Sequence, residues 1–192
     1  MHDYSLDSCE RQRTCFGLAV LSICTAWLMK SVYVHIPWWF DAPSVLGLYG
    51  IYCKLFDKYG WKWEFLNKSR LINTPNINGT WGGFLQSSYD NHEEKYPAII
   101  EIKQEWTKII IIFKAGESSS KSITASFLTK NSDGALLYYQ YTNEPKSSAA
   151  ETMQIHRGTA WFRFSNDFIS FEGEYYTGRG RSNFGSLTFK KK

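Results

Sequence analysis

From residue 77 onward the chain repeats one pattern, a short run of β-branched and aromatic residues followed by turn residues. Eight such runs are recognisable, at about 79–89, 98–104, 107–114, 121–128, 135–142, 157–164, 168–176 and 185–190. The segments between them include AGESSS, NSDG, NEPKSS, SND and TGRGRSN, which are rich in residues that favour turns. No helix-length periodic segment interrupts the runs, which argues against a βαβ arrangement. The carboxyl-terminal two thirds is therefore predicted to be all-β.

The first of these runs opens with INGTWGGF, at residues 77–84. A Gly-x-Trp motif at the start of a β-rich stretch is typical of ligand-carrying up-and-down barrels. About 120 residues in eight strands would fit a sandwich or a barrel, and the motif favours the barrel. We therefore predict an eight-stranded up-and-down, lipocalin-like β-barrel over residues 77–192.

The amino-terminal third has a different character, since residues 14–40 contain Lys30 as their only formal charge. A lysine can extend its charge toward the membrane interface, so the apolar length is expected to continue past Lys30 to Ile36. A helix over 15–36 would be about 33 Å long, enough to cross a bilayer. After a turn, a second apolar helix is expected over about 43–63, with Pro43 in its first turn. The two segments together predict a transmembrane hairpin.

The residues that flank this hairpin indicate its orientation. Aromatic residues typical of membrane interfaces lie at both ends, namely Trp38 and Trp39 at one and Tyr59, Trp61 and Trp63 at the other. The basic residues are Arg11 and Arg13 before the first segment and Lys54, Lys58, Lys62, Lys68 and Arg70 at or after the second. The turn between the segments has none. By the positive-inside rule, both flanks are cytoplasmic.

These patterns divide the chain into a transmembrane anchor at 1–66, a linker at 67–76 and a barrel at 77–192. A secretory signal peptide is disfavoured, because acidic residues stand where its positive region is required and a second apolar segment follows. A soluble helical hairpin packed on the barrel is the stronger alternative, since the second span is interrupted by charges and glycines. All four cysteines precede residue 71, which favours a reducing compartment for the β-rich part.

Alternation along the seventh run indicates what the barrel holds. Its acidic residues, Glu172 and Glu174, share the face that should meet solvent, so Tyr175 and Thr177 on the other face are predicted to point inward. Interior tyrosine, threonine and serine mixed with glycine suit a polar, flat ligand better than a lipid.

Arg179 and Arg181 are the main candidates for ligand contacts, because they lie in a glycine-rich turn at a barrel mouth. They either belong to a solvated loop or clamp phosphate oxygens while nearby tyrosine rings stack on bases. Further candidates are Tyr139, Arg157, Arg163 and Trp81. Of these, Trp81 also suits the role of a plug in the barrel floor.

Signals for catalysis, metal binding and nucleic-acid binding are weak. The four histidines are scattered, with no HExxH motif and no Cys/His ligand spacing. Glu93 and Glu94 lie in a polar loop and resemble a solvated charge cluster. The net charge of +4 is spread along the chain, so no DNA or RNA partner is expected. We therefore expect neither an enzyme nor a protein with a resident cofactor.

The order of these parts resembles the two-transmembrane, β-barrel effectors of bacterial antiphage systems built on cyclic-oligonucleotide signalling (CBASS). The motifs that carry the resemblance are NGTWGG and FEGEYYTGRGRSNFGSLTF, and it covers nearly the whole chain. It implies a cyclic dinucleotide ligand, made by a cyclic-nucleotide synthase that phage infection activates. It further implies self-association into homo-oligomers, disruption of the inner membrane and cell death. The location implied is the bacterial inner membrane, multi-pass, with the amino terminus and the barrel cytoplasmic.

Two other functions fit parts of the sequence. One is a non-toxic, membrane-tethered, lipocalin-like carrier or sensor of a lipid or other small molecule. The other is a membrane enzyme that uses the barrel cavity. Interior polarity favours the nucleotide receptor over the lipid carrier, and the lack of an acid–base constellation argues against the enzyme.

Overall fold

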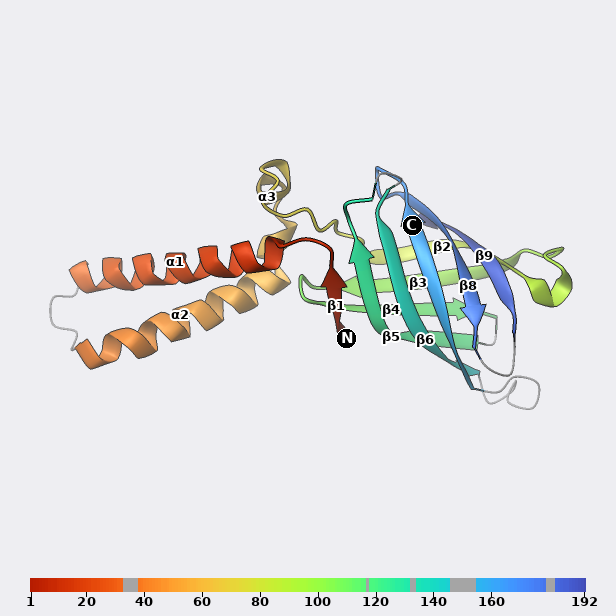
Figure 1. The fold of residues 1–192 in the computed structure, drawn as a ribbon, viewed down its shortest axis with the longest axis horizontal. Coiled ribbons are helices and arrows are strands. Elements are labelled where there is room, and N and C mark those ends of the chain that lie inside the picture. Colours follow the sequence, from red (N-terminus) through yellow and green to blue (C-terminus); the bar gives the residue numbers. More distant parts are fainter. Residues whose placement is uncertain (33–37, 117, 132–133, 146–154, 179–181) are drawn as a thin grey trace. The chain divides into compact units, whose positions relative to one another are not determined.

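A computed structural model describes residues 1–32, 38–116, 118–131, 134–145, 155–178 and 182–192. The chain forms two compact units (Figure 1). One unit comprises Met1–Asp7 and Pro75–Lys192, and the other comprises Ser8–Thr74. The chain therefore passes between the units twice, once after residue 7 and once after residue 74.

The first unit is a closed β-barrel in which the structure describes nine strands. Their bounds are His2–Leu6 (β1), Gly79–Ser87 (β2), Tyr96–Gln104 (β3), Lys108–Ala115 (β4), Ser118–Leu128 (β5), Leu136–Pro145 (β6), His156–Phe164 (β7), Ser170–Thr177 (β8) and Phe184–Lys191 (β9). From β2 to β9 each strand is antiparallel to the next, and β9 pairs with β2 to close the barrel. Each of the eight runs predicted from the sequence is a strand.

The predicted strand count is wrong by one, because β1 completes the seam between β4 and β5 (Figure 1). These two strands pair near their shared turn, from Ala115↔Ser118 to Ile112↔Lys121. Farther along, β1 lies between them, antiparallel to β4 and parallel to β5. Tyr4 is buried, His2 and Leu6 are half-buried on the same face, and Asp3 and Ser5 are exposed. The segment HDYSL therefore alternates, but it has only five residues and lies far from the other strands in the sequence, too weak a signal to predict a strand.

Side chains hold β1 in this seam. A register irregularity in β5 follows Ser122, whose Oγ accepts a hydrogen bond from the Ile111 N–H at 2.9 Å. The same hydroxyl lies 2.7 Å from Nε2 of His2. Just past β1, the Asp7 carboxylate accepts bonds from the Thr129 N–H (3.0 Å), the Thr129 hydroxyl (2.8 Å) and the Lys130 N–H (2.9 Å). Partial burial favours the neutral acid, but these bonds outweigh it and lower the pKa of Asp7.

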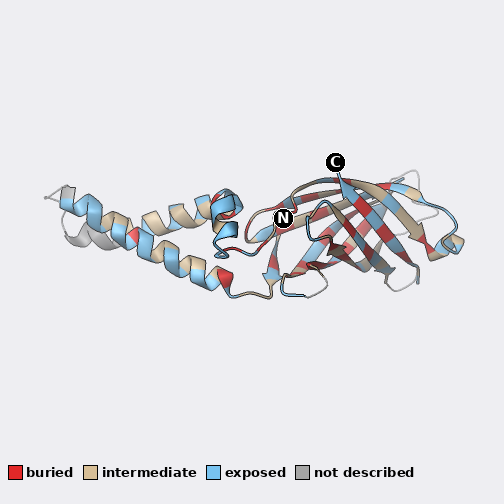
Figure 2. Ribbon diagram, turned by 90° about the horizontal axis from the view of Figure 1, so that it is seen from above, coloured by how far each residue is buried: buried red, intermediate tan, exposed pale blue. Residues whose placement is uncertain are grey.

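The barrel core consists of inward-facing residues, which alternate with exposed ones along each strand (Figure 2). Trp81 on β2 is fully buried, and its ring lies 5.7 Å from that of Phe164 and 5.0 Å from that of Phe171. Gly173 permits close packing of β8 on β7, because a Cβ at this position would overlap the carbonyl oxygen of Trp161. One end of the barrel is thus filled by aromatic rings.

The second unit contains two long helices, α1 (Glu10–Val32) and α2 (Trp38–Lys58), followed by the 3₁₀ turn η1 (Gly60–Lys62) and the short helix α3 (Glu64–Lys68). The long helices pack against each other, and the Tyr52 hydroxyl donates to Oγ1 of Thr25 at 3.2 Å. The buried Glu10 carboxylate accepts bonds from the Asn73 N–H (2.7 Å) and the Thr74 hydroxyl. These bonds tie the start of α1 to the segment that leads out of the unit.

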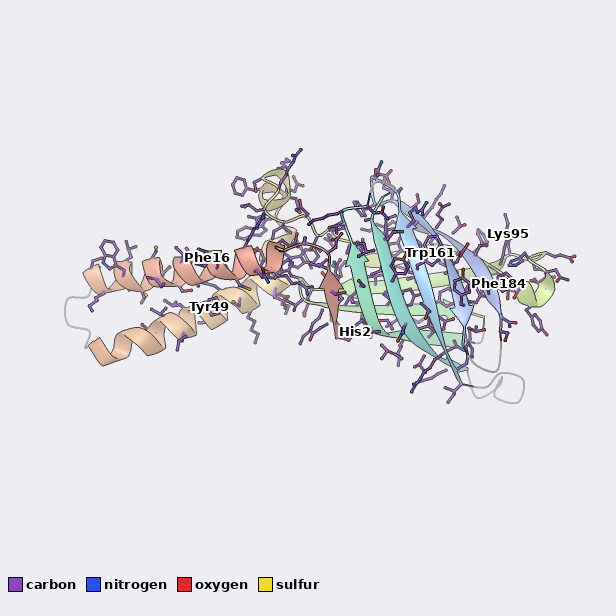
Figure 3. All side chains as sticks on the ribbon, viewed as in Figure 1. His2, Phe16, Tyr49, Lys95, Trp161 and Phe184 are labelled. Atoms are coloured by element: carbon purple, nitrogen blue, oxygen red, sulfur yellow. The ribbon has the colours of Figure 1, made fainter. Side chains whose placement is uncertain are left out.

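One helix within the described residues, Glu10–Ser31, is long and apolar enough to cross a membrane. Its large side chains are exposed, among them Phe16, labelled in Figure 3, and Trp27. Of the two predicted spans, only this one meets the criterion among the described residues, because α2 contains Asp41, Lys54 and Asp57 beside tyrosines and glycines. The helical hairpin itself is present, with α1 beginning and α2 ending several residues earlier than the predicted spans.

Two tryptophans on opposite faces of the barrel test the core assignment. Trp81→Ala is expected to lower the free energy of unfolding by about 3–5 kcal/mol, because it leaves a cavity among aromatic rings. Trp161 lies on the outer face of β7, with the guanidinium of Arg163 5.7 Å from its ring (Figure 3), so Trp161→Ala is expected to cost about 1 kcal/mol. Denaturation of the detergent-solubilised chain, followed by circular dichroism, measures both losses. Equal losses would contradict the placement of Trp81 in the core.

Candidate functional site

The barrel contains a cavity of about 490 Å³ at the end away from Trp81. It opens at the end of the barrel where β2, β4, β6 and β8 end and β3, β5, β7 and β9 begin, and every lining residue belongs to the barrel unit. Its volume lies within the range of about 300–1,000 Å³ that is usual for small-molecule sites. The closed wall and the aromatic floor therefore leave a site that is accessible from one end.

The lining combines aromatic rings with small polar groups. Its residues are Leu85, Ser87, Tyr89, Tyr96, Pro97, Phe113, Ala115, Gly116, Ser118, Ser120, Tyr139, Tyr141, Asn143, His156, Tyr175, Thr177, Asn183 and Leu187. Within this described lining there is no Lys, Arg, Asp or Glu. The cavity therefore offers flat rings, hydroxyls and amides to a ligand.

Strand β6 supplies three buried polar side chains of the lining. Tyr139, Tyr141 and Asn143 alternate with outward-facing residues and are buried. The rings of Tyr139 and Tyr141 lie 6.1 Å apart at 49°. Opposite Tyr141, Gly158 leaves room for the phenol, because a Cβ there would overlap the Tyr141 hydroxyl. The wall at this point is shaped around two tyrosine rings.

The two buried phenols of β6 stay neutral. Burial, with a smaller contribution from the neighbouring phenol of Tyr141, raises the pKa of Tyr139 far above its ordinary value. Burial likewise raises the pKa of Tyr141, and Tyr175 adds to the effect. Near the cavity mouth, the Tyr175 hydroxyl donates to Oγ of Ser87 at 3.0 Å, which fixes the ring against β2. The site thus holds neutral O–H groups in defined positions.

The β8–β9 connection starts and ends at the cavity wall. The Thr177 hydroxyl and the Thr177 N–H both donate to the Asn183 carbonyl oxygen, at 2.9 and 2.8 Å. In return the Asn183 N–H donates to Oγ1 of Thr177 at 2.8 Å. Both residues line the cavity. Arg179 and Arg181, the main candidates from the sequence, lie outside the described residues, between these two anchor points.

The other candidate residues occupy three different places. Tyr139, Tyr175 and Thr177 line the cavity. Arg157 and Arg163 lie on the outer face of β7, because the inward positions of that strand are taken by residues such as Ala160 and Phe162.

Trp81 belongs to the core, where its indole N–H donates to the Ile77 carbonyl oxygen at 3.3 Å. The structure therefore brings Tyr139, Tyr175 and Thr177 together in the cavity. It places Arg157, Arg163 and Trp81 outside the lining. That any of them contacts a ligand stays a prediction.

Sequence reasoning missed most of the polar lining. Ser118 and Ser120 line the cavity from β5, but three consecutive serines in SSSKS do not show which of them face inward. For Tyr141 and Asn143 no signal exists either, because LLYYQYTN mixes polar and apolar residues on both faces. Across the described part of the chain, no three His, Cys, Asp or Glu side chains gather as a metal site requires.

The chain is similar to known proteins over most of its length. Residues 72–191 match the family model described as Cap15, cyclic dinucleotide receptor domain. The chain is also 36% identical, over 162 residues, to CD-NTase-associated protein 15 of Yersinia aleksiciae. That match covers 82% of this chain and 74% of the Yersinia protein.

Alkaline unfolding tests the burial of the cavity tyrosines. A phenol whose pKa is raised by folding contributes stability that is present below about pH 10, its value in the unfolded chain, and is lost as the pH rises further. Tyr139→Phe is therefore expected to reduce the loss of thermal stability between about pH 9 and about pH 11. Tyr138→Phe, on the outer face, is the matched control and should behave as the unchanged protein. Identical effects of the two substitutions would contradict the burial of the Tyr139 phenol.

Proposed function

The chain belongs to the Cap15 family of cyclic dinucleotide receptors, which are CBASS effectors, and we propose that its ligand binds in the cavity at the open end of the barrel. The observation that carries this proposal is the lining itself, with five tyrosines among serine, threonine and asparagine side chains. Tyrosine rings stack on bases, an interaction worth about 1–3 kcal/mol per base, while hydroxyls and amides bond base and ribose edges.

The phosphates of the ligand require positive charge. Since the described lining has no Lys or Arg, we assign this role to Arg179 and Arg181, in the connection between Thr177 and Asn183. A guanidinium pairs with phosphate through two parallel hydrogen bonds. In this proposal the neutral side chains of the cavity surround the bases, and the two guanidinium groups lie beside the phosphates.

Ligand binding is proposed to act on the membrane through self-association. Two helices cannot by themselves enclose a water path, because each satisfies its own backbone and presents an apolar surface to lipid. Many copies held together by their barrels would crowd the hairpins, disrupt the inner membrane and kill the infected cell. In this scheme both helices are embedded, the barrel is cytoplasmic and the ligand comes from a cyclic-nucleotide synthase. The protein acts as a receptor, with no reaction of its own.

The alternative is a membrane-tethered carrier that binds its ligand without assembling. Its best support is the barrel architecture, which it shares with the receptor. A lipid carrier would need an apolar interior, and the buried Asn143 and Ser120 disfavour one.

The arginine assignment has a matched set of substitutions. Arg179→Ala and Arg181→Ala are each expected to weaken binding of a cyclic dinucleotide at least about tenfold, since a charge-assisted hydrogen bond contributes about 1.5–3 kcal/mol. Arg157→Ala and Arg163→Ala, on the outer face of β7, are the controls and should leave the affinity unchanged. Isothermal titration calorimetry gives the affinities, and the melting temperature without ligand verifies the fold. Losses confined to the two control variants would place the phosphates elsewhere.

The effector function predicts toxicity that depends on the ligand. The full-length protein should be harmless when expressed alone and should depolarise the membrane when the cyclase is co-expressed. The ligand must bind the assembled state more tightly than the single chain, or it could not shift the equilibrium. Sedimentation of the detergent-solubilised protein, with and without cyclic dinucleotide, measures this shift. Tight binding with an unchanged sedimentation profile and membrane potential would refute assembly and favour the carrier.

A further inference from the structure

The gap between β4 and β5, called here the β4–β5 cleft, is shaped to accept one strand. Below the four paired positions near their turn, β4 and β5 no longer bond to each other. Their backbones instead bond β1, at Lys108 and Ile109 of β4 and at residues 125–127 of β5. Without a strand in this cleft, those N–H and C=O groups would form two unpaired edges, a state that proteins avoid.

Side chains keep the cleft open. The Ile111 N–H, just past the β1 pairing, donates to Oγ of Ser122 instead of to a carbonyl of β5. The register of β5 is irregular immediately afterwards, between Ser122 and Thr124. The separation of β4 and β5 is thus a specific feature of the wall, and a five-residue strand fits it.

The contacts of β1 are made to this cleft and to the neighbouring end of β3. Tyr4 is buried in the barrel core, and its hydroxyl accepts a bond from Nε2 of Gln104 at 3.2 Å. His2 lies against Ser122, and the Asp7 carboxylate accepts three bonds at the end of β5. Every one of these contacts would be the same if the strand came from another copy of the chain.

Every copy of this chain contains both the strand β1 and a cleft that accepts it. Residues 1–7 belong to the barrel unit, and the next unit begins at Ser8. Only Ser8 and Cys9 separate Asp7 from α1. Each chain therefore has one strand just before its first helix and one cleft in its barrel wall.

We propose that the β4–β5 cleft is an interface between copies of this chain, in which the cleft of one subunit accepts β1 of its neighbour. The inference rests on the assembly step of the proposed function and names the contact that forms it. Exchange replaces each bond with an identical one, so its cost is low. Because strand and cleft are different surfaces, each chain can give β1 to one neighbour and receive it from another. Such head-to-tail contacts extend to many copies.

Strand exchange would also interleave the membrane helices. A β1 that sits in a neighbouring barrel fixes the start of its own α1 beside that barrel. The other connection, after Thr74, keeps the helices attached to their own barrel. Each hairpin is then shared between two barrels, which is the crowding that membrane disruption requires.

Ser5 and Ser126 provide the test, because they are paired across β1 and β5 and point away from the core. Cys9, Cys15, Cys24 and Cys53 are first replaced by alanine, and this background is checked for ligand-driven assembly. Two differently tagged full-length chains, one with Ser5→Cys and one with Ser126→Cys, are then co-expressed and oxidised in membranes with and without cyclic dinucleotide. Exchange predicts a disulfide between the two chains that increases with ligand. The control partner is Ser186→Cys, an exposed position on β9, which should give none.

A chain with both Ser5→Cys and Ser126→Cys tests the same inference from the opposite direction. Oxidation before ligand is added locks β1 into its own barrel. The locked chain should bind cyclic dinucleotide with unchanged affinity, fail to assemble, and recover assembly when the disulfide is reduced.

Ligand-driven assembly of the locked chain, or assembly of the mixed chains without an interchain disulfide, would overturn the exchange and leave the proposed function intact. If the cysteine-free chain with its serines intact binds ligand and does not assemble, the assembly step of the proposed function fails, and the exchange fails with it. Binding and assembly are measured separately, so the two failures are distinguishable.

Discussion

Closure of the barrel is the constraint on which the other features depend. A sheet that bends into a barrel must pair every edge, and here the pairing of β4 with β5 covers only the part near their turn. The incoming strand β1 supplies the rest, held by Tyr4 in the core and by Asp7 at its end. Because the wall is then continuous, the aromatic core at one end and the polar cavity at the other can coexist in a single small barrel.

The parts of this fold that could be predicted are those with a local signal. Runs of β-branched and aromatic residues separated by turn residues were sufficient for the strands β2 to β9, and acidic residues on one face of β8 were sufficient to orient Tyr175 and Thr177. The strand β1 could not be found in this way, since its position depends on a gap in partners more than 100 residues away. Tyr138 and Tyr139 are adjacent and identical, and only the tertiary pairing decides that the second is buried and the first is half-exposed.

Under the proposed function, the cavity would bind a doubly charged ligand without charged residues in the described lining. Burying an unpaired guanidinium would carry a large desolvation cost, whereas buried phenols and amides need only a hydrogen-bond partner. The phenols of Tyr139 and Tyr141 stay neutral through burial, so they donate without adding charge. Under the proposed function the arginines of the β8–β9 connection approach the phosphates at the mouth, where water still solvates them. The site then discriminates by ring stacking inside and by charge at the rim.

The cavity and the β1 cleft are built on the same two strands. Phe113, Ala115, Ser118 and Ser120 line the cavity at one end of β4 and β5, and β1 pairs with the other ends. On the inner face of β5, Ser122 continues the row of cavity serines and bonds both Ile111 and His2. A ligand that alters the spacing of these strands at the cavity therefore acts on the seat of β1 two residues away. Such coupling is reciprocal. If the ligand raises the equilibrium constant for assembly by some factor, assembly raises the affinity for the ligand by the same factor. An assembled receptor would hold its cyclic dinucleotide more tightly than a single chain, which favours an all-or-none response over a graded one.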